Sequence, residues 1–246
     1  MHVIVTGAAS GIGRASALRL GRRMKVVVAD KDGEGARRVA AEIKANGGQA
    51  LGVEVDVTSR AAVFAMAEEA RRAFGPVDAL FANAGINRRN PVDQISEADW
   101  DLMIATHVKG MFLCCQAVLG EMVERGRGAI VNTSSDFAIM GVAGNATYTA
   151  AKGAIYSMTK ALACEFTPKG VRVNAIGPGP IDTPIIASGR TPEQYAASRR
   201  KFAEMLPLGR MGDPDEVAVV VDFLLSDRAS YISGQILHPN GGQLMW

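Results

Sequence analysis

Tyr148 and Lys152 stand four positions apart and have the chemistry of an acid/base pair. An unperturbed tyrosine has a pKa near ~10, which is too high for a good base at neutral pH. A spacing of four places both side chains on one face of a helix, where the positive charge of the lysine would lower the pKa of the tyrosine. Such a tyrosine can take a proton from a hydroxyl or return it to a carbonyl. Ser135 follows an apolar run and is expected to donate a hydrogen bond to the same substrate oxygen.

A glycine-rich segment, TGAASGIG over residues 6–13, lies between a predicted strand and a predicted helix. Gly7 allows a tight turn, Gly11 lets the backbone approach a pyrophosphate, and Gly13 lets the helix lie close to the sheet. The free N–H groups at the start of the helix attract phosphates. The sequence therefore predicts a dinucleotide site that contains Gly7, Ser10, Gly11, Ile12 and Gly13.

An acidic residue, Asp30, ends the second predicted strand. A carboxylate at this position accepts hydrogen bonds from the ribose hydroxyls of the adenosine and repels a 2′-phosphate. Ser10 is not basic either, so both residues favour NAD over NADP. Lys31 follows Asp30 and partly counters this preference.

Short apolar runs alternate with amphipathic stretches along the chain. Several runs are apolar throughout, as strands buried on both faces of a parallel sheet are. We therefore expect one α/β domain over residues 1–246, a doubly wound Rossmann fold with a seven-stranded parallel sheet. The predicted strands are His2–Thr6, Lys25–Ala29, Ala50–Val55, Ala79–Ala82, Gly128–Thr133, Arg172–Ile176 and Gln235–His238, and helices begin near Gly11, Gly33, Ser59, Glu97, Thr147 and Pro214.

The segment from Pro178 to about Gly212 interrupts this alternation, because it is rich in proline and contains the basic run 199–201. It is expected to form a long loop with one or two short helices. Long insertions after strands often close over a substrate. We therefore predict a substrate loop or lid over residues 180–212.

Further short motifs follow the later strands: Asp56-Val57, Asn83-Ala84-Gly85 and Pro178-Gly179. Together with the glycine segment and Ser135, Tyr148 and Lys152, they occur in the order typical of one family. The chain resembles the compact subclass of the short-chain dehydrogenase/reductases over nearly its whole length, although Ala82 stands where a second asparagine is usual. The resemblance implies cofactor contacts from Asp56, Val57, Asn83, Ala84, Gly85, Tyr148, Lys152, Pro178, Gly179, Ile181 and Thr183.

One position departs from the family pattern. Members of the family carry an asparagine in a long helix, where it supports a water-linked proton path to the lysine, and the matching residue here is His107. Histidine donates, accepts and titrates near neutral pH, so His107 is a candidate for a catalytic relay. A helix histidine without a catalytic role fits the sequence equally.

The resemblance implies an NAD-dependent oxidoreductase that transfers a hydride between nicotinamide and a secondary alcohol or ketone. One alternative is an NADP-dependent 3-oxoacyl-thioester reductase, which Asp30 disfavours. Another is a non-catalytic dinucleotide-sensing protein, which would be free to lose Tyr148 or Lys152. Relatives usually form tetramers, so a homotetramer is expected.

The substrate is less defined by the sequence. The pocket wall is expected from residues 136–145, from the segment after Gly85 and from the loop after Gly179. Apolar residues follow Ser135 and indicate an apolar part of a small-molecule substrate. Arg88 and Arg89 follow Gly85, and a carboxylate or phosphate on the substrate would explain them. Solvated surface charge explains them as well.

Composition excludes several other classes. The formal net charge is +2, with dispersed basic residues, which gives no case for nucleic acid or a membrane surface. No metal-ligand spacing is present. Three cysteines are interpreted as buried free thiols on helices, which fits a cytoplasmic protein. No secretory signal is recognised, and no apolar run is expected to span a bilayer.

Overall fold

The computed structural model describes residues 1–187 and 191–245, and within them seven parallel strands form one sheet in the order β3-β2-β1-β4-β5-β6-β7. The order reverses between β1 and β4, which opens a crevice at the carboxyl ends of the strands. The predicted doubly wound Rossmann fold is therefore confirmed. The strands are β1 His2–Thr6, β2 Lys25–Asp30, β3 Ala50–Glu54, β4 Ala79–Ala82, β5 Gly128–Thr133, β6 Val171–Ile176 and β7 Ile236–Leu237.

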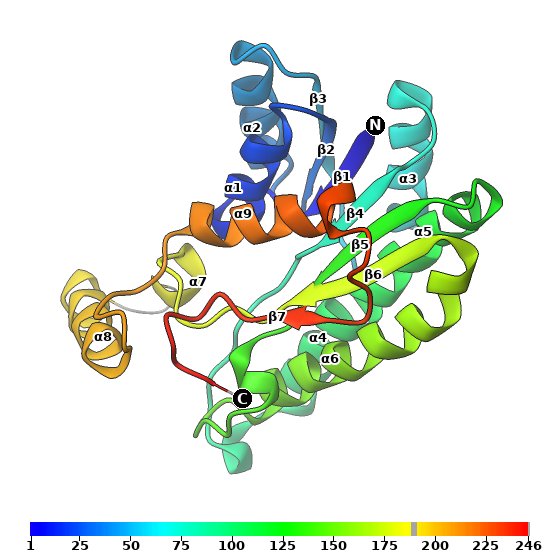
Figure 1. Cartoon of the computed structure of the whole chain (residues 1–246). Coiled ribbons are helices and arrows are strands. Elements are labelled where there is room, and N and C mark those ends of the chain that lie inside the picture. The colour runs from blue at the N-terminus through cyan, green and yellow to red at the C-terminus, as the bar shows by residue number, and fades with distance from the viewer. Residues whose placement is uncertain (188–190, 246) are drawn as a thin grey trace.

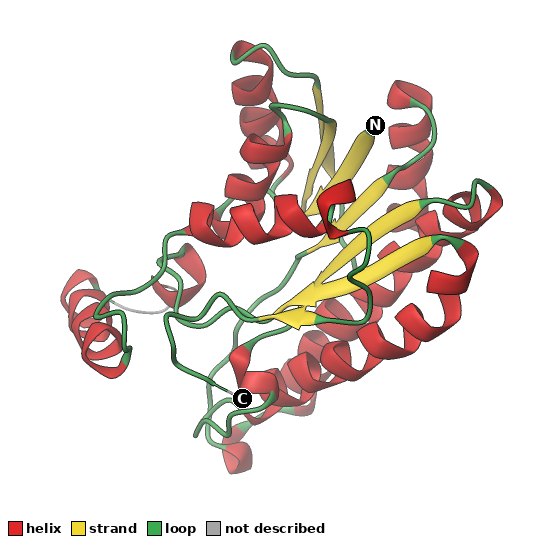
Figure 2. Ribbon diagram, viewed as in Figure 1, coloured by secondary structure: helices red, strands yellow, loops and turns green. Residues whose placement is uncertain are grey.

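Helices cover both faces of the sheet (Figures 1 and 2). One face carries α1 Gly11–Leu20, α2 Gly33–Ala45 and α9 Pro214–Leu224, and α1 packs along α9. The other face carries α3 Arg60–Phe74, α4 Glu97–Ile104, α5 Gly110–Glu124 and α6 Ala146–Phe166. Two separate apolar clusters, one on each side, fill the space between helices and sheet.

Local sequence sets several of these boundaries. The valines of β2 are fully buried, as expected for a central strand of a parallel sheet. Ser59, near which a helix was predicted to begin, caps α3 by accepting a hydrogen bond from the Ala62 N–H. Asp213 and Glu216 form a capping box at the start of α9, with Pro214 in its first turn.

A single turn of π-helix over residues 105–109 joins α4 to α5 and contains His107. The resulting helical stretch, Glu97–Glu124, meets the length and composition of a membrane span, which the sequence had not led us to expect. Most of the stretch is buried inside the molecule, where α5 packs against α3 and β4. It has the environment of a core helix.

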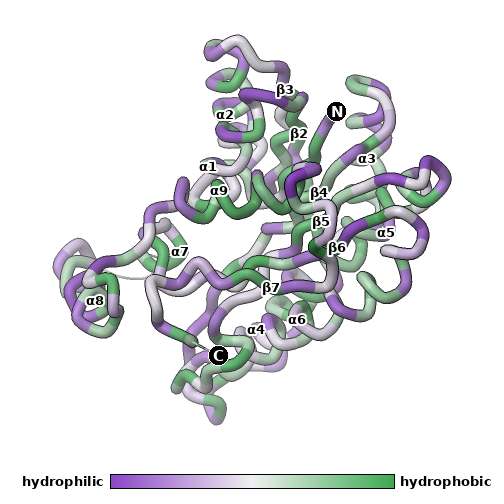
Figure 3. Tube along the Cα trace, in the orientation of Figure 1, coloured by the Kyte–Doolittle hydropathy of each residue, from purple (hydrophilic) through white to green (hydrophobic). Residues whose placement is uncertain are grey.

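The segment predicted as a substrate loop contains α7 Pro184–Ala187 and α8 Pro192–Met205. Residues 188–190 of this predicted loop lie outside the described residues. α8 is longer than the short helices expected, because Thr191 and Gln194 form a capping box that starts it. α8 has no buried residue and lies at the periphery, with many hydrophilic positions, whereas α9 is largely hydrophobic (Figure 3).

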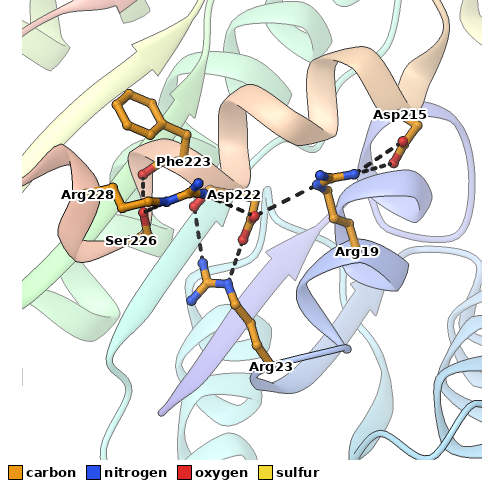
Figure 4. A network of polar contacts seen from close by, with 7 residues as sticks. All are labelled: Arg19, Arg23, Asp215, Asp222, Phe223, Ser226 and Arg228. Atoms are coloured by element: carbon orange, nitrogen blue, oxygen red, sulfur yellow. Dashed lines mark hydrogen bonds and ion pairs between the residues drawn. The ribbon is translucent and has the colours of Figure 1, made fainter.

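A polar network on the surface joins α1 to α9 (Figure 4). Asp222 accepts a hydrogen bond from Arg23 at 2.6 Å and lies within ion-pair distance of Arg19 and Arg228. Arg19 also pairs with Asp215 at 3.3 Å. The network fixes α9 against the helix that begins at the glycine segment.

Two of the three cysteines, Cys114 and Cys115, are buried as predicted. Cys164 is exposed, so the prediction was wrong for this residue. It lies on α6 on a side that the described part of the chain does not cover.

Candidate active site

A cleft of about 1340 Å³ opens at the carboxyl ends of the strands. Its walls come from loops after β1, β2, β4 and β5, from α6, and from the segment after β6. Every predicted site residue lines this cleft except Gly13, the last residue of the glycine segment. The folding of the chain therefore brings together residues that are up to 176 positions apart (Gly7 and Thr183).

The glycine segment has the backbone that only glycine adopts readily. Gly7 has a φ of 64° and Gly11 a φ of 53°. A Cβ atom at Gly13 would collide with the carbonyl oxygen of Gly7, so α1 can approach the turn only without a side chain there. Ser10 makes no side-chain capping bond to α1, which leaves the first N–H groups of this helix open toward the cleft.

Asp30 is held rigidly at the end of β2. One carboxylate oxygen accepts the Ala9 N–H at 2.9 Å, and the other accepts the Asp32 N–H at 3.0 Å. Lys31 does not pair with Asp30, because its ammonium donates to Asp56 at 2.8 Å. That bond, with two more from Thr58, lowers the pKa of Asp56 to about 2.

Asn83 ties the glycine segment to the centre of the sheet. Its amide donates to the carbonyl oxygens of Thr6 and Gly7, each at 3.2 Å. Its backbone N–H and that of Ala84 donate to the Thr6 hydroxyl. Thr6 begins the glycine segment, but its role as the acceptor of these bonds was not predicted from the sequence.

The turn after β6 closes the cleft from the other side. The Pro178 carbonyl accepts the Asp136 N–H at 3.2 Å, which links this turn to the segment that carries Ser135. Ile181 and Thr183 are buried, and the Thr183 side chain lies against Gly11. Asp182, which sequence reasoning missed, accepts a hydrogen bond from Tyr195 and forms an ion pair with Arg199, and so holds α8 to this turn.

Ser135, Tyr148 and Lys152 converge in the cleft. Ser135 lies two residues after the end of β5, and its hydroxyl makes a hydrogen bond with the Tyr148 side chain. The Lys152 ammonium is 5.4 Å from the centre of the Tyr148 ring and donates to the carbonyl oxygen of Thr133 at 2.8 Å. Lys152 itself is only 3% exposed.

Burial dominates the electrostatics of this group. It lowers the pKa of Lys152 to about 7. It raises the pKa of Tyr148 to about 12, and the hydrogen bond with Ser135 opposes this by a smaller amount. The expected lowering of the tyrosine pKa by Lys152 is therefore absent in the protein alone, because desolvation outweighs it.

His107 lies beside the reacting group. Its ring is 1% exposed and meets the Tyr148 ring edge-on, with the centres 5.4 Å apart. Nε2 lies 2.7 Å from the Ile86 carbonyl oxygen, and Nδ1 is buried without a hydrogen-bond partner among the described residues. Burial, and then the charge of Lys152, lowers the pKa of His107 to about 3. The burial of His107 therefore opposes the titration near neutral pH that is usual for a histidine.

A glycine makes room for this histidine. A Cβ atom at Gly85 would lie 2.6 Å from Cε1 of His107, so the larger ring fits because Gly85 has no side chain. The π-turn over residues 105–109 places His107 toward the cleft, and such turns are frequent at functional sites.

The described residues fit a dinucleotide. The glycine segment and the start of α1 can receive the pyrophosphate, and Asp30 can receive the adenosine ribose. Val55 and Val57 line the cleft next to Asp30, as an adenine site requires. Tyr148, Lys152 and Pro178 lie at the other end, where a nicotinamide ring would face the substrate.

Proteins that resemble this chain in sequence and in structure include known dehydrogenases and reductases. A family profile described as Enoyl-(Acyl carrier protein) reductase matches residues 7–243. The solved structure of a short-chain type dehydrogenase/reductase from Mycobacterium marinum superposes with a TM-score of 0.92 at 31% identity, covering 100% of this chain and 96% of that chain.

The chain belongs to the short-chain dehydrogenase/reductase family.

Two curated members of the family show the range of its substrates. A cis-4-hydroxycyclohexanecarboxylate dehydrogenase of Sinomonas cyclohexanicum is 40% identical over 97% of this chain and 94% of its own length. A 3-oxoacyl-[acyl-carrier-protein] reductase of Staphylococcus aureus is 38% identical over 98% of this chain and 97% of its own length. This short-chain dehydrogenase/reductase is accordingly an oxidoreductase of alcohol or ketone groups and binds a nicotinamide dinucleotide.

Proposed function

We propose that this protein oxidises a secondary alcohol with NAD and reduces the corresponding ketone with NADH. The observation that carries the proposal is the convergence of Ser135, Tyr148 and Lys152 at one end of a cleft whose other end holds the glycine segment and Asp30. A nicotinamide bound in this cleft would supply the hydride acceptor for oxidation of the carbinol carbon and the hydride donor for reduction of the ketone.

Tyr148 handles the proton of this reaction. As the C–H bond of the alcohol breaks, the O–H bond also breaks, and its proton passes to the tyrosine oxygen, which leaves a carbonyl. Ser135 donates a hydrogen bond to the substrate oxygen and holds it near Tyr148. A proton donor or acceptor placed in this way typically contributes about 10²–10⁴-fold to the rate.

Lys152 holds the ribose of the nicotinamide and places a cation near Tyr148. The protein alone keeps the tyrosine protonated, with a pKa of about 12. The positive charge of the oxidised nicotinamide, added to that of Lys152, favours the tyrosinate. We therefore propose that the tyrosine becomes a competent base only in the complex with the cofactor.

His107 acts by position. A pKa of about 3 keeps it neutral at physiological pH, so it does not carry a charge along a relay. Its bond to the Ile86 carbonyl and its edge-on contact with Tyr148 fix the tyrosine ring against the segment after β4.

Asp30 supports NAD rather than NADP. Two backbone N–H groups hold its carboxylate in place, so it cannot turn away from a 2′-phosphate. The similarity to a 3-oxoacyl-[acyl-carrier-protein] reductase keeps a 3-oxoacyl-thioester reductase as the second candidate. An Asp30→Ala variant should gain activity with NADP relative to NAD, and an unchanged preference would remove Asp30 as the ribose ligand.

We also propose a cytoplasmic homotetramer. Trp100 and Phe112 are exposed apolar side chains on the helical stretch 97–124 that do not line the cleft, and a partner subunit would cover them. Light scattering should give the mass of four chains, and a monomer would contradict the assembly.

The reaction is tested by following NAD reduction with secondary alcohols, hydroxy acids and sugars, and NADPH oxidation with 3-oxoacyl thioesters. Wild type and Tyr148→Phe are compared, and NADH binding is measured for both. Oxidation that the variant loses while it still binds NADH supports the proposal. Thioester reduction with NADPH in place of alcohol oxidation would favour the second candidate. Binding without turnover across the panel would favour a dinucleotide sensor.

A further inference from the structure

The substrate end of the cleft carries an uncompensated positive charge. Arg88 and Arg89 line it on the segment after β4, and one acidic residue, Asp99 of α4, lines it beside them. Arg88 lies 3.7 Å from the Asp99 carboxylate, so these two charges offset each other. Arg89 has no acidic partner among residues 1–187 and 191–245.

The arginine segment is fixed beside the catalytic helix. The Asn90 N–H donates to the Gly144 carbonyl oxygen at 3.1 Å, and Asn145 then begins α6, which carries Tyr148. This bond fixes the backbone next to Arg89 against the residues that precede α6, and the exposed side chain of Arg89 lines the same cleft as Tyr148.

The remaining walls at this end are largely apolar. Phe137 meets the Tyr148 ring edge-on with the centres 6.0 Å apart, and Phe202 of α8 also lines the cleft. Leu102 and Ile185 also line the cleft and are 37% and 39% exposed. Large apolar side chains that face a cleft are covered when an apolar ligand enters it.

We propose that the substrate is a hydroxy acid whose carboxylate binds Arg89 and whose carbon skeleton lies against Phe137, Ile185 and Phe202. The inference rests on the proposed function, since it assigns the substrate class of the same site. The guanidinium presents two parallel N–H donors that match the two oxygens of a carboxylate. Lys152 is reserved for the cofactor, so Arg89 would be the one guanidinium without an acidic partner among the described residues that meets the substrate, and it fits a singly charged carboxylate better than a phosphate monoester.

Hydroxycyclohexanecarboxylates test this directly, with 4-methylcyclohexanol as the neutral counterpart and a cyclohexanediol monophosphate as the phosphate counterpart. Wild type should oxidise at least one carboxylate isomer with a kcat/KM well above that of the neutral alcohol and the phosphate. Arg89→Gln should lower kcat/KM for the carboxylate about tenfold to hundredfold, mainly through KM, and leave the neutral alcohol unchanged. Arg89→Lys should restore part of the loss.

Two matched arginine variants serve as controls. Arg72→Gln removes an exposed arginine of α3 that does not line the cleft, and it should have no effect. Arg88→Gln should have a smaller effect than Arg89→Gln, because Asp99 already offsets the charge of Arg88. A larger effect at Arg88, or equal effects at all three positions, would overturn the assignment to Arg89.

A binding measurement separates this inference from the proposed function. Calorimetry on the NADH-loaded protein with cyclohexanecarboxylate should give a Kd that rises about tenfold to hundredfold in Arg89→Gln and is unchanged in Arg72→Gln and Tyr148→Phe. If the carboxylate binds through Arg89 but no alcohol is oxidised, the inference about the substrate stands and the proposed reaction is contradicted. Turnover of neutral alcohols or phosphates as fast as the acids, or no carboxylate binding, would overturn the inference.

Discussion

The two ends of the cleft are built in different ways. At the dinucleotide end, the glycine segment is fixed by Asn83, and Asp30 is fixed by two backbone N–H groups. At the substrate end, the walls include the exposed Arg88 and Arg89 on the segment after β4 and the half-buried Phe202 of α8, a helix that has no buried residue.

This difference places the reaction at the rigid end of the cleft and the choice of substrate at the other end. The dinucleotide and the reacting atoms need fixed geometry, which a close-packed sheet edge supplies. The substrate is recognised by side chains whose replacement does not disturb the sheet. We therefore expect substitutions at the dinucleotide end to affect folding and every activity, and substitutions at the substrate end to affect the choice of substrate.

Gly13→Ala should give the largest effect. The added methyl group would collide with the Gly7 carbonyl oxygen and press on the Asn83 amide, and both belong to the framework of the glycine segment. We expect a loss of about 2–4 kcal/mol in the free energy of unfolding, with NADH binding lost even where the protein folds. Urea unfolding and NADH fluorescence measure the two effects.

Gly47→Ala offers a control, since nothing lies within 4 Å of a Cβ atom at that position, although its φ of 83° adds some strain. It should leave NADH binding intact. If Gly13→Ala bound NADH as tightly as wild type, the proposal that the dinucleotide end needs a fixed geometry would be contradicted.

His107→Asn should alter the acid stability. The pKa of His107 is about 3 in the folded protein and near 6.5 when unfolded, so the unfolded chain binds the extra proton between these values. The free energy of unfolding therefore falls as the pH decreases from about 6.5 to 3, by about 1.4 kcal/mol per pH unit from this group. The variant should show a shallower decline in urea unfolding over this window.

Activity measurements test the positioning role of His107. Asparagine retains a donor for the Ile86 carbonyl, so a positioning role predicts preserved kcat and an unchanged pH profile of kcat above pH 6. His107→Ala should lower kcat because Tyr148 loses its edge-on contact. A pH dependence of stability identical to wild type would show that His107 is not held neutral by burial.

Asp222→Asn tests the network between α1 and α9 in Figure 4. The carboxylate is 15% exposed and faces three arginines, so its loss should lower the free energy of unfolding by about 1 kcal/mol, less at high salt. Salt-dependent thermal unfolding measures this. A loss that does not change with salt would point to packing instead.

Phe202→Ala should have the smallest effect on stability. The side chain lies on peripheral α8, so we expect a change below about 1 kcal/mol in the free energy of unfolding. KM for a bulky substrate should rise several-fold while the Kd for NADH stays constant. A large loss of stability would show that α8 belongs to the same rigid body as the dinucleotide end.

The sequence predicted the dinucleotide end well for a physical reason. Backbone turns that need glycine, and a tyrosine and lysine on one helix face, are constraints that act between near neighbours in the chain. The strands were placed to within about two residues for the same reason, because continuous apolar runs identify them.

Contacts between distant residues were not predictable in this way. Three features depend on residues that only the fold brings together. They are the hydrogen bond from Lys152 to the Thr133 carbonyl, the ion pair of Asp182 with Arg199 of α8, and the burial that raises the pKa of Tyr148. The neutral state of His107 has the same origin, since its residue type alone indicates titration near neutral pH.

The most direct test of the proposed reaction is isotopic. The alcohol of the panel that is oxidised fastest is prepared with deuterium at the carbinol carbon and incubated with NAD and the protein, and the NADH formed is analysed by mass spectrometry. The account predicts one deuterium per NADH, with the rate reduced about 10²–10⁴-fold in Tyr148→Phe. NADH without deuterium, or an undiminished rate in Tyr148→Phe, would contradict hydride transfer with Tyr148 as the acid/base.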